Sequence, residues 1–304
     1  MKLIVSVFTV IAGILISYQA SSQVPVEISG KIVTMSKGEQ PAFIVEIPQA
    51  SAENVEKSWM KLIRQNTKSK VSTENNEITI LNTQIDAIYD KPINIYSAVY
   101  QVDSAVKIVS LFEIDSSFFS FDGDKEDMTY ERIYRGIEHF LHDFAVTEYR
   151  EVVEEELKAE NKELKNLNSD LQKLVKQTET FQKKIKQNES DSLNAEAQIS
   201  SLEIDKQRKQ GEIDSKKESM SSIAGDKELH DEAKKHLKSL EKQRKKIEKE
   251  IDKLKANIVE YHSDNVELKR SILENNKQKE ELLDEISKQQ ETVKKVNGKV
   301  ENIK

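Results

Sequence analysis

The stretch MSSIAGDKEL, residues 220–229, interrupts a C-terminal half that otherwise favours helix from residue 151 to residue 304. Its centre is Gly225-Asp226, which joins a residue that commonly ends helices to one that commonly caps them. No proline follows Pro92, so nothing else in this half is expected to break a helix. The stretch is therefore either an irregularity in one long rod or the turn at which a helix reverses direction.

A heptad repeat flanks the stretch on both sides. Before it, alternate steps of four and three residues give a mostly apolar series: Val153, Leu157, Glu160, Leu164, Leu167, Leu171, Leu174, Thr178, Phe181, Ile185, Asn188, Ser192, Ala195, Ile199, Leu202, Lys206, Lys209, Ile213, Lys216, Met220 and Ile223. After it, a second series runs through Leu237, Leu240, Arg244, Ile247, Ile251, Leu254, Ile258, Tyr261, Asn265, Leu268, Ile272, Asn275, Lys279, Leu282, Ile286, Gln289, Val293, Val296, Val300 and Ile303. Repeats of this length indicate a coiled coil.

The two heptad frames do not join. Carried forward, the first frame predicts core positions at Lys227, His230 and Lys234, which are all polar. One long helix could absorb a three-residue shift as a stammer and pair with a second chain in a parallel dimer. Alternatively, two arms of about 75 residues, each on the order of 110 Å long, fold back as an antiparallel hairpin.

A hairpin turn centred between residues 226 and 227 makes a specific pairing. Its polar layers coincide, because Asn188 meets Asn265 and Thr178 meets Asn275. The remaining layers pair Leu157 with Val296, Leu171 with Leu282, Phe181 with Ile272, Ile185 with Leu268, Leu202 with Ile251, Ser192 with Tyr261 and Ala195 with Ile258. A polar layer facing an apolar one would cost stability, so these matches favour the hairpin.

Charge bears on the same choice. At the base of the hairpin the acidic segment EVVEEELKAENKE (151–163) meets the basic segment KKVNGKVENIK (294–304), which is favourable. Against the hairpin, Lys209 would face Arg244, and KQRKQ (206–210) would lie beside EKQRKK (241–246). We predict the hairpin, with the parallel rod as the alternative, and place its break near residues 221–229.

The N-terminal half reads as a small α+β domain over residues 23–150. Dense alternation and β-branched residues predict strands at 26–35, 41–48, 77–85, 93–102 and 105–114, in a mostly antiparallel sheet. Turn-like pairs separate them: Lys37-Gly38, Asn75-Asn76, Lys91-Pro92 and Asp103-Ser104.

Two helices are expected to close onto this sheet. The first, SAENVEKSWMKLIRQ, begins with Ser51 as its cap and presents Val55, Trp59, Leu62 and Ile63 on one face. The second lies in residues 121–144 and carries Ile133, Ile137, Phe140 and Phe144 at helical spacing. The predicted fold class is thus α+β, a small antiparallel sheet with two helices, followed by a long α-helical coiled coil.

The first 22 residues have the pattern of an export signal. Met1-Lys2 precede an apolar run over residues 3–16 and then small residues, with Ala20 and Ser22 placed for cleavage. An uncleaved anchor is the alternative, but the run is shorter than the roughly 20 residues of a membrane span. Later segments are not apolar enough to span a membrane. We expect a protein of the periplasm or extracellular space, and the absence of cysteine excludes disulfides and thiol chemistry.

The motifs for common chemistries are missing. The net charge of −7 argues against nucleic-acid binding, and neither GxxxxGK nor GxGxxG occurs. His139 and His142 could both bind a metal from one helix, but no third ligand follows at a suitable spacing, so an exposed helix face is the simpler interpretation. We assign no catalytic, cofactor or metal residue and expect no enzyme activity.

The order of features resembles a group of exported Bacteroidota proteins. The resemblance rests on MSKGEQPAFIVEIPQASAENVEKSWMKLIRQ (35–65), VSLFEIDSSFFS (109–120) and IEHFLHDFAVTEYREVVEEELKAENKELKNL (137–167). It covers most of the chain after the signal and implies no activity. In architecture alone, the hairpin arms also resemble periplasmic Skp-like chaperones, which are basic and lack the N-terminal domain.

Two functions follow from these patterns. The first is a non-enzymatic envelope scaffold or adaptor that binds protein partners through its α+β head and its coiled coil, with homo-oligomerisation possible. The second is a periplasmic holdase chaperone that shields unfolded clients between helical arms. The sequence favours the first.

Overall fold

A computed structural model describes residues 26–65, 67–222 and 226–303. The expected signal peptide and Gly225 lie outside these residues. The described chain forms two compact units, one holding the residues up to Glu163 together with Gln289–Lys304, and the other holding Leu164–Lys288.

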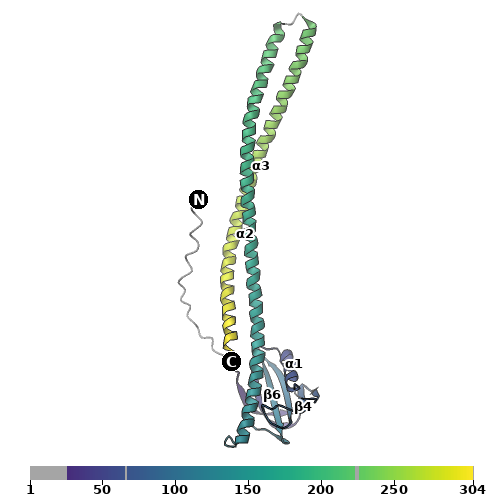
Figure 1. Ribbon diagram of the computed structural model, residues 1–304, viewed down its shortest axis with the longest axis vertical. Coiled ribbons are helices and arrows are strands. Elements are labelled where there is room, and N and C mark those ends of the chain that lie inside the picture. The colour runs from purple at the N-terminus through teal and green to yellow at the C-terminus, as the bar shows by residue number, and fades with distance from the viewer. Residues whose placement is uncertain (1–25, 66, 223–225, 304) are drawn as a thin grey trace, which may run out of the picture. The chain divides into compact units, whose positions relative to one another are not determined.

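The first unit, the head, is built on a seven-stranded antiparallel sheet (Figure 1). In chain order its elements are β1 (Ile28–Met35), β2 (Gly38–Pro48), α1 (Ala52–Ile63), β3 (Val71–Glu74), β4 (Glu77–Thr83), β5 (Ile93–Val102), β6 (Ala105–Ile114) and β7 (Ser117–Phe118). The strand order is β1-β2-β6-β5-β4-β3, and β7 pairs with β6. All five predicted strands are present, while β3 and β7 were not predicted.

Three of the four predicted turns, at Gly38, Asn75-Asn76 and Asp103, contain residues with positive φ. Asn75 and Asn76, with φ of 52° and 62°, join β3 to β4 as a two-residue hairpin loop. Asp103, with φ of 51°, begins the loop between β5 and β6. Each loop sets the register of its hairpin and thereby decides which side chains face the core.

Both predicted helices pack on the same face of this sheet. Val55, Trp59 and Ile63 of α1 are fully buried, and Leu62 is half-buried. The Trp59 ring contacts Phe140 and Phe144, which lie on α2 (Met128–Ser222), at ring-centroid distances of 5.7 and 5.1 Å. The core residues shared by both helices and the sheet include Ile47, Ile80, Ile95, Ile108, Ile133, Ile137 and Leu141. The α+β fold class is confirmed.

The cap predicted for α1 is wrong in its chemistry. Ser51 occupies the N-cap position, but its side chain makes no capping hydrogen bond. Instead, the Ala52 N–H donates to Gln101 Oε1 at 3.0 Å, so a residue of β5 satisfies the helix end. A local sequence rule cannot find such a donor–acceptor pair, because its partners are 49 residues apart.

The predicted hairpin is confirmed. α2 and α3 (Lys227–Asn302) belong to one chain and pair in the predicted antiparallel register. Asn188 Nδ2 donates to Asn265 Oδ1 at 3.0 Å, and Asn275 Nδ2 lies 3.5 Å from Thr178 Oγ1. Within the described residues every predicted heptad position is buried or half-buried, and the second frame extends back to His230 and Ala233. Asp226 caps α3, since its Oδ1 accepts the N–H groups of Glu228 and Leu229.

The C-terminal end of α3 completes the head core. Val296 and Ile303 are buried there, and Leu157 packs against the same cluster. The expected attraction between the acidic and basic segments is present as an ion pair between Lys299 Nζ and Glu156, at 3.0 Å. Arg150 Nη2 also donates to the Ile303 carbonyl at 2.8 Å.

Candidate interaction surfaces

The head carries a recess on the sheet face opposite its main core. The recess has a volume of about 600 Å³ and is lined by strands and turns alone: Thr34, Met35, Ser36, Lys37, Ser72, Glu74, Asn75, Asn76, Glu77, Thr79, Leu81, Tyr96, Ala98 and Tyr100. A small buried cluster of Ala42, Tyr96 and Leu111 lies on this side of the sheet. The recess is therefore a formed feature of the folded sheet.

Hydrogen bonds hold the β1–β2 turn over this recess. The Ser36 N–H donates to Glu77 Oε2 at 3.0 Å, and the Ser36 hydroxyl donates to Glu77 Oε1. The Lys37 ammonium lies 5.0 Å from the centroid of the Tyr96 ring, a cation–π distance. These contacts join residues from β1–β2 to residues of β4 and β5, which fixes the rim of the recess.

The Tyr96 hydroxyl in the recess is held by hydrogen bonding. The Tyr96 hydroxyl donates to Glu113 Oε2 at 3.0 Å, and Asn94 Nδ2 donates to the same oxygen at 2.9 Å. Burial, and then the nearby Glu113 carboxylate, raise the pKa of Tyr96 to about 12. Tyr96 is consequently neutral at physiological pH and serves as a hydrogen-bonding group rather than a nucleophile.

Leu81 and Tyr100 provide the apolar part of this surface. Their exposed fractions are 46% and 47%, although both lie within the recess lining. They are surrounded by short hydrogen-bonding side chains such as Ser72 and Thr79. Apolar anchors within a ring of hydrogen-bonding groups are typical of protein recognition sites.

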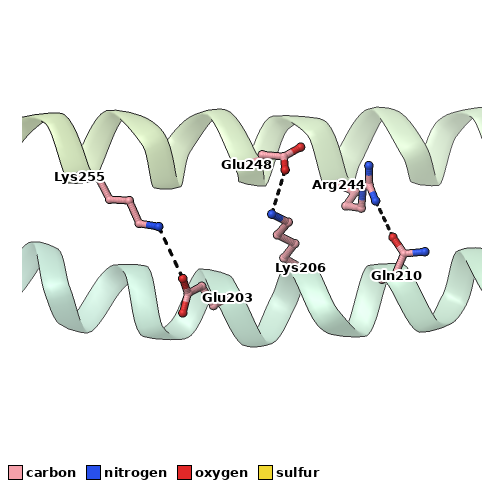
Figure 2. Close-up of polar contacts among 6 residues, drawn as sticks. All are labelled: Glu203, Lys206, Gln210, Arg244, Glu248 and Lys255. Carbon is pink, nitrogen blue, oxygen red and sulfur yellow. Dashed lines mark hydrogen bonds and ion pairs between the residues drawn. The ribbon is translucent and has the colours of Figure 1, made fainter.

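The hairpin contains a polar stretch in its seam (Figure 2). Lys206 Nζ pairs with Glu248 Oε1 at 2.9 Å, and Arg244 Nη1 donates to Gln210 Oε1 at 2.6 Å. Lys209, which was expected to face Arg244 unfavourably, instead pairs with Glu212 on its own helix at 2.7 Å. The Lys206 ammonium lowers the pKa of Glu248 by hydrogen bonding and by charge, and Lys209 does the same for Glu212. Each cation thus has its own acceptor, which relieves the predicted repulsion.

Six exposed apolar side chains form what we call the apolar row of the hairpin, whereas the exposed Ile204 and Leu229 lie off this row. Its members are Val175 and Leu193 on α2, and Val259, Val266, Leu273 and Leu283 on α3. The four residues Leu193, Val259, Val266 and Leu273 are exposed by between 63% and 71%. The sequence contains this signal, because Val259, Val266 and Leu273 recur every seven positions, each one residue after a seam position.

The two histidines considered as metal ligands do not form a site with other ligands. His139 is exposed, and His142 Nδ1 lies 3.6 Å from Asp143 Oδ1. Among the described residues, no group of three His, Cys, Asp or Glu side chains is placed to hold a metal ion. In the same part of the chain, no helix is long and apolar enough to cross a bilayer.

One buried carboxylate lies apart from these surfaces. Glu148 on α2 is buried in the head, and burial raises its pKa while a hydrogen bond with Ser58 partly opposes the rise. Ser58 lies on α1, so this contact belongs to the packing of α1 on α2.

Comparisons of the chain with protein families, with curated proteins and with solved structures gave no match.

Proposed function

We propose that the protein is a non-enzymatic scaffold or adaptor, exported to the cell envelope, that binds protein partners through its head and its coiled coil. The recess on the head is the observation that carries this proposal. It offers two half-exposed apolar anchors, Leu81 and Tyr100, among hydroxyl and amide groups. Such a lining suits an extended segment or loop of a partner, whose backbone hydrogen-bonds while one side chain enters the recess.

The chemistry of the lining supports binding over catalysis. General acid–base catalysis needs a group that titrates near the working pH. Tyr96 has its pKa raised to about 12, and the Glu77 carboxylate is engaged by Ser36. The export of the protein remains a proposal that rests on the pattern of residues 1–22.

A capture experiment tests the role of the recess. Full-length protein is used as bait in an envelope extract, beside a Leu81→Asp/Tyr100→Asp variant and an Ile32→Ser control, whose altered side chain is exposed on β1 outside the recess. We expect wild type and control to enrich one set of proteins that the recess variant loses. Enrichment of the same set by the recess variant would contradict the proposal.

The holdase hypothesis has one observation in its favour, the apolar row, since exposed apolar side chains can hold unfolded chains. The heptad residues fill most of the seam, and the cavity of about 520 Å³ between the arms near the turn, lined by residues such as Ser215, His236 and Leu240, is too small to enclose an unfolded chain. Suppression of the aggregation of an unfolded porin at equimolar protein would support this hypothesis. Aggregation at the rate of the porin alone would remove it.

A further inference from the structure

The apolar row lies on a single side of the hairpin. Val259, Val266 and Leu273 each directly follow a seam residue of α3 and are seven residues apart, so they form one line along the helix. Leu193 has the same heptad position on α2. Val175 and Leu283 follow the other seam position, which projects to the same side of each helix.

Two ion pairs show that these sides coincide on the two helices. Glu203 and Lys255, which share the heptad position of Val175 and Leu283, approach to 3.9 Å across the seam (Figure 2). Lys184 and Asp264, at the heptad position on the other side, approach to 3.7 Å. The apolar row of α2 and that of α3 therefore border the same side of the seam.

The opposite side of the hairpin is different in character. Along α3 it carries exposed glutamates at every seventh residue: Glu260, Glu267, Glu274 and Glu281. Among the described residues of α2 and α3 between 164 and 288, no large apolar side chain on that side is among the exposed ones, apart from Leu229 next to the turn. The acidic side is favourably exposed to water, whereas the other side exposes apolar side chains to water.

In the middle of the hairpin, the charges that flank the seam on the apolar side have opposite signs on the two helices. On α2 this stretch is acidic, with the exposed residues Glu189, Glu196 and Glu203, and Lys217 follows at the same heptad position nearer the turn. On α3 the stretch carries the exposed Lys255 and Lys269 on either side of His262, and Glu241 and Glu248 take the same heptad position nearer the turn. A second hairpin turned by 180° about the long axis places the acidic stretch of each copy over the basic stretch of the other. A copy packed in the opposite direction would place acidic stretch against acidic stretch.

We propose that the apolar row is the interface between two copies of this chain, which pack side by side in the same direction as a four-helix bundle. The register of Asn188 with Asn265 sets Leu193 level with Val259 along the hairpin. Leu193 of one copy then meets Val259 of the other, and glutamates of α2 face the basic residues of α3. This dimer differs from the parallel rod, because each seam stays within one chain. It is independent of the proposed function of the head.

Cysteine cross-linking tests the interface directly, since the chain contains no cysteine of its own. Leu193→Cys and Val259→Cys chains are purified separately, mixed and exposed to a mild oxidant or a short bismaleimide. We expect covalent dimers in the mixture and at least about tenfold fewer with either variant alone, as the two-fold arrangement requires. Asn194→Cys mixed with Glu260→Cys, on the acidic side of the same level, serves as the control and should give no covalent dimer.

Mass in solution provides the second measurement. Light scattering should give twice the chain mass for the wild type, and Val266→Glu should weaken the dimer about 100-fold, because each substitution occurs twice in a two-fold interface. Glu267→Gln on the acidic side is the matched control and should leave the dimer intact. A wild-type chain that stays monomeric at a concentration 100-fold above micromolar would overturn the proposal. Cross-links that form at the acidic side instead would also overturn it.

Discussion

The head core and the hairpin seam bury their side chains by different rules. In the head, Trp59, Phe43 and Ile47 are completely buried, and the inner face of the sheet admits a polar pair, Ser97 with Ser110, whose hydroxyls bond to each other at 3.0 Å. In the seam, apolar layers alternate with polar ones such as Asn188–Asn265. The head core is thus stabilised by closely packed side chains. In the seam, the polar layers lower the stability but fix the register of the two helices.

The largest effect should come from removing volume in the head. Trp59→Ala deletes a ring that contacts Phe140 and Phe144, so we expect a loss of about 3–5 kcal/mol in the free energy of unfolding. Urea denaturation monitored by circular dichroism measures it. Tyr100→Ala, an exposed aromatic in the same domain, is the control and should change little. Equal effects of the two substitutions would show that packing at Trp59 is not the source of head stability.

Two glycines of α2 sharpen the contrast between the regions. A Cβ at Gly136 would lie 2.3 Å from the Ala87 carbonyl oxygen and 2.8 Å from Ile88 Cα, whereas a Cβ at Gly211 would meet nothing within 4 Å. Gly136→Ala should therefore cost about 1–3 kcal/mol through overpacking. Gly211→Ala should stabilise the helix by about 0.5–1 kcal/mol, because alanine favours helix over glycine. Thermal melts of both variants measure these changes in stability. Changes of the same sign in the two variants would contradict the expected contrast.

The layer of Asn188 and Asn265 tests whether polar layers lower the stability of the seam while they fix its register. Asn188→Leu leaves the buried Asn265 amide without its partner, and we expect a loss of about 1–3 kcal/mol. The double change Asn188→Leu/Asn265→Leu should recover that loss or exceed it, since an apolar layer fits the rest of the seam. Denaturant unfolding of both variants and the wild type provides the comparison. Additive losses in the double variant would show that the layer is not a coupled pair.

The ion pair between Lys206 and Glu248 should have the smallest effect, because water reaches both side chains, which are 37% and 43% exposed. The direction in which this stabilisation changes with pH follows from the pKa shift of Glu248. The ammonium lowers the pKa of Glu248 below its ordinary 4.5 in the folded state, so the pair stabilises the fold above that value. The difference between wild type and Lys206→Gln should be present at pH 7 and vanish as the pH falls through the lowered pKa. A difference that grows on acidification would contradict the assignment.

Sequence periodicity was sufficient for the hairpin because its determinants are local and repeated. The two heptad frames, their mismatch at residues 220–229 and the matching polar layers together predicted the pairing of Thr178 with Asn275. For the same reason the strands with clear alternation were found. The strand β3, VSTE, is four residues long and mostly exposed, so it lacks the alternation that identifies a strand.

The surfaces were less predictable because they depend on tertiary arrangement. The recess exists because the β1–β2 turn reaches Glu77, a contact between residues 41 positions apart. Leu141 is completely buried, yet it was left out of the predicted helix stripe, which was narrower than the face that α1 and the sheet enclose. The reach of Gln101 to the end of α1 is a further contact of this kind.

The most direct test of the central claim is a cysteine pair at the asparagine layer. In Asn188→Cys/Asn265→Cys, oxidation should give a disulfide within each chain, seen as a faster-migrating monomer on a denaturing gel. The displaced pair Asn188→Cys/Ile258→Cys, one heptad away on α3, should not form it. In a parallel rod, residue 188 of one chain lies beside residue 188 of the other. Covalent dimers from Asn188→Cys alone, without an intrachain bond in the double variant, would contradict the hairpin.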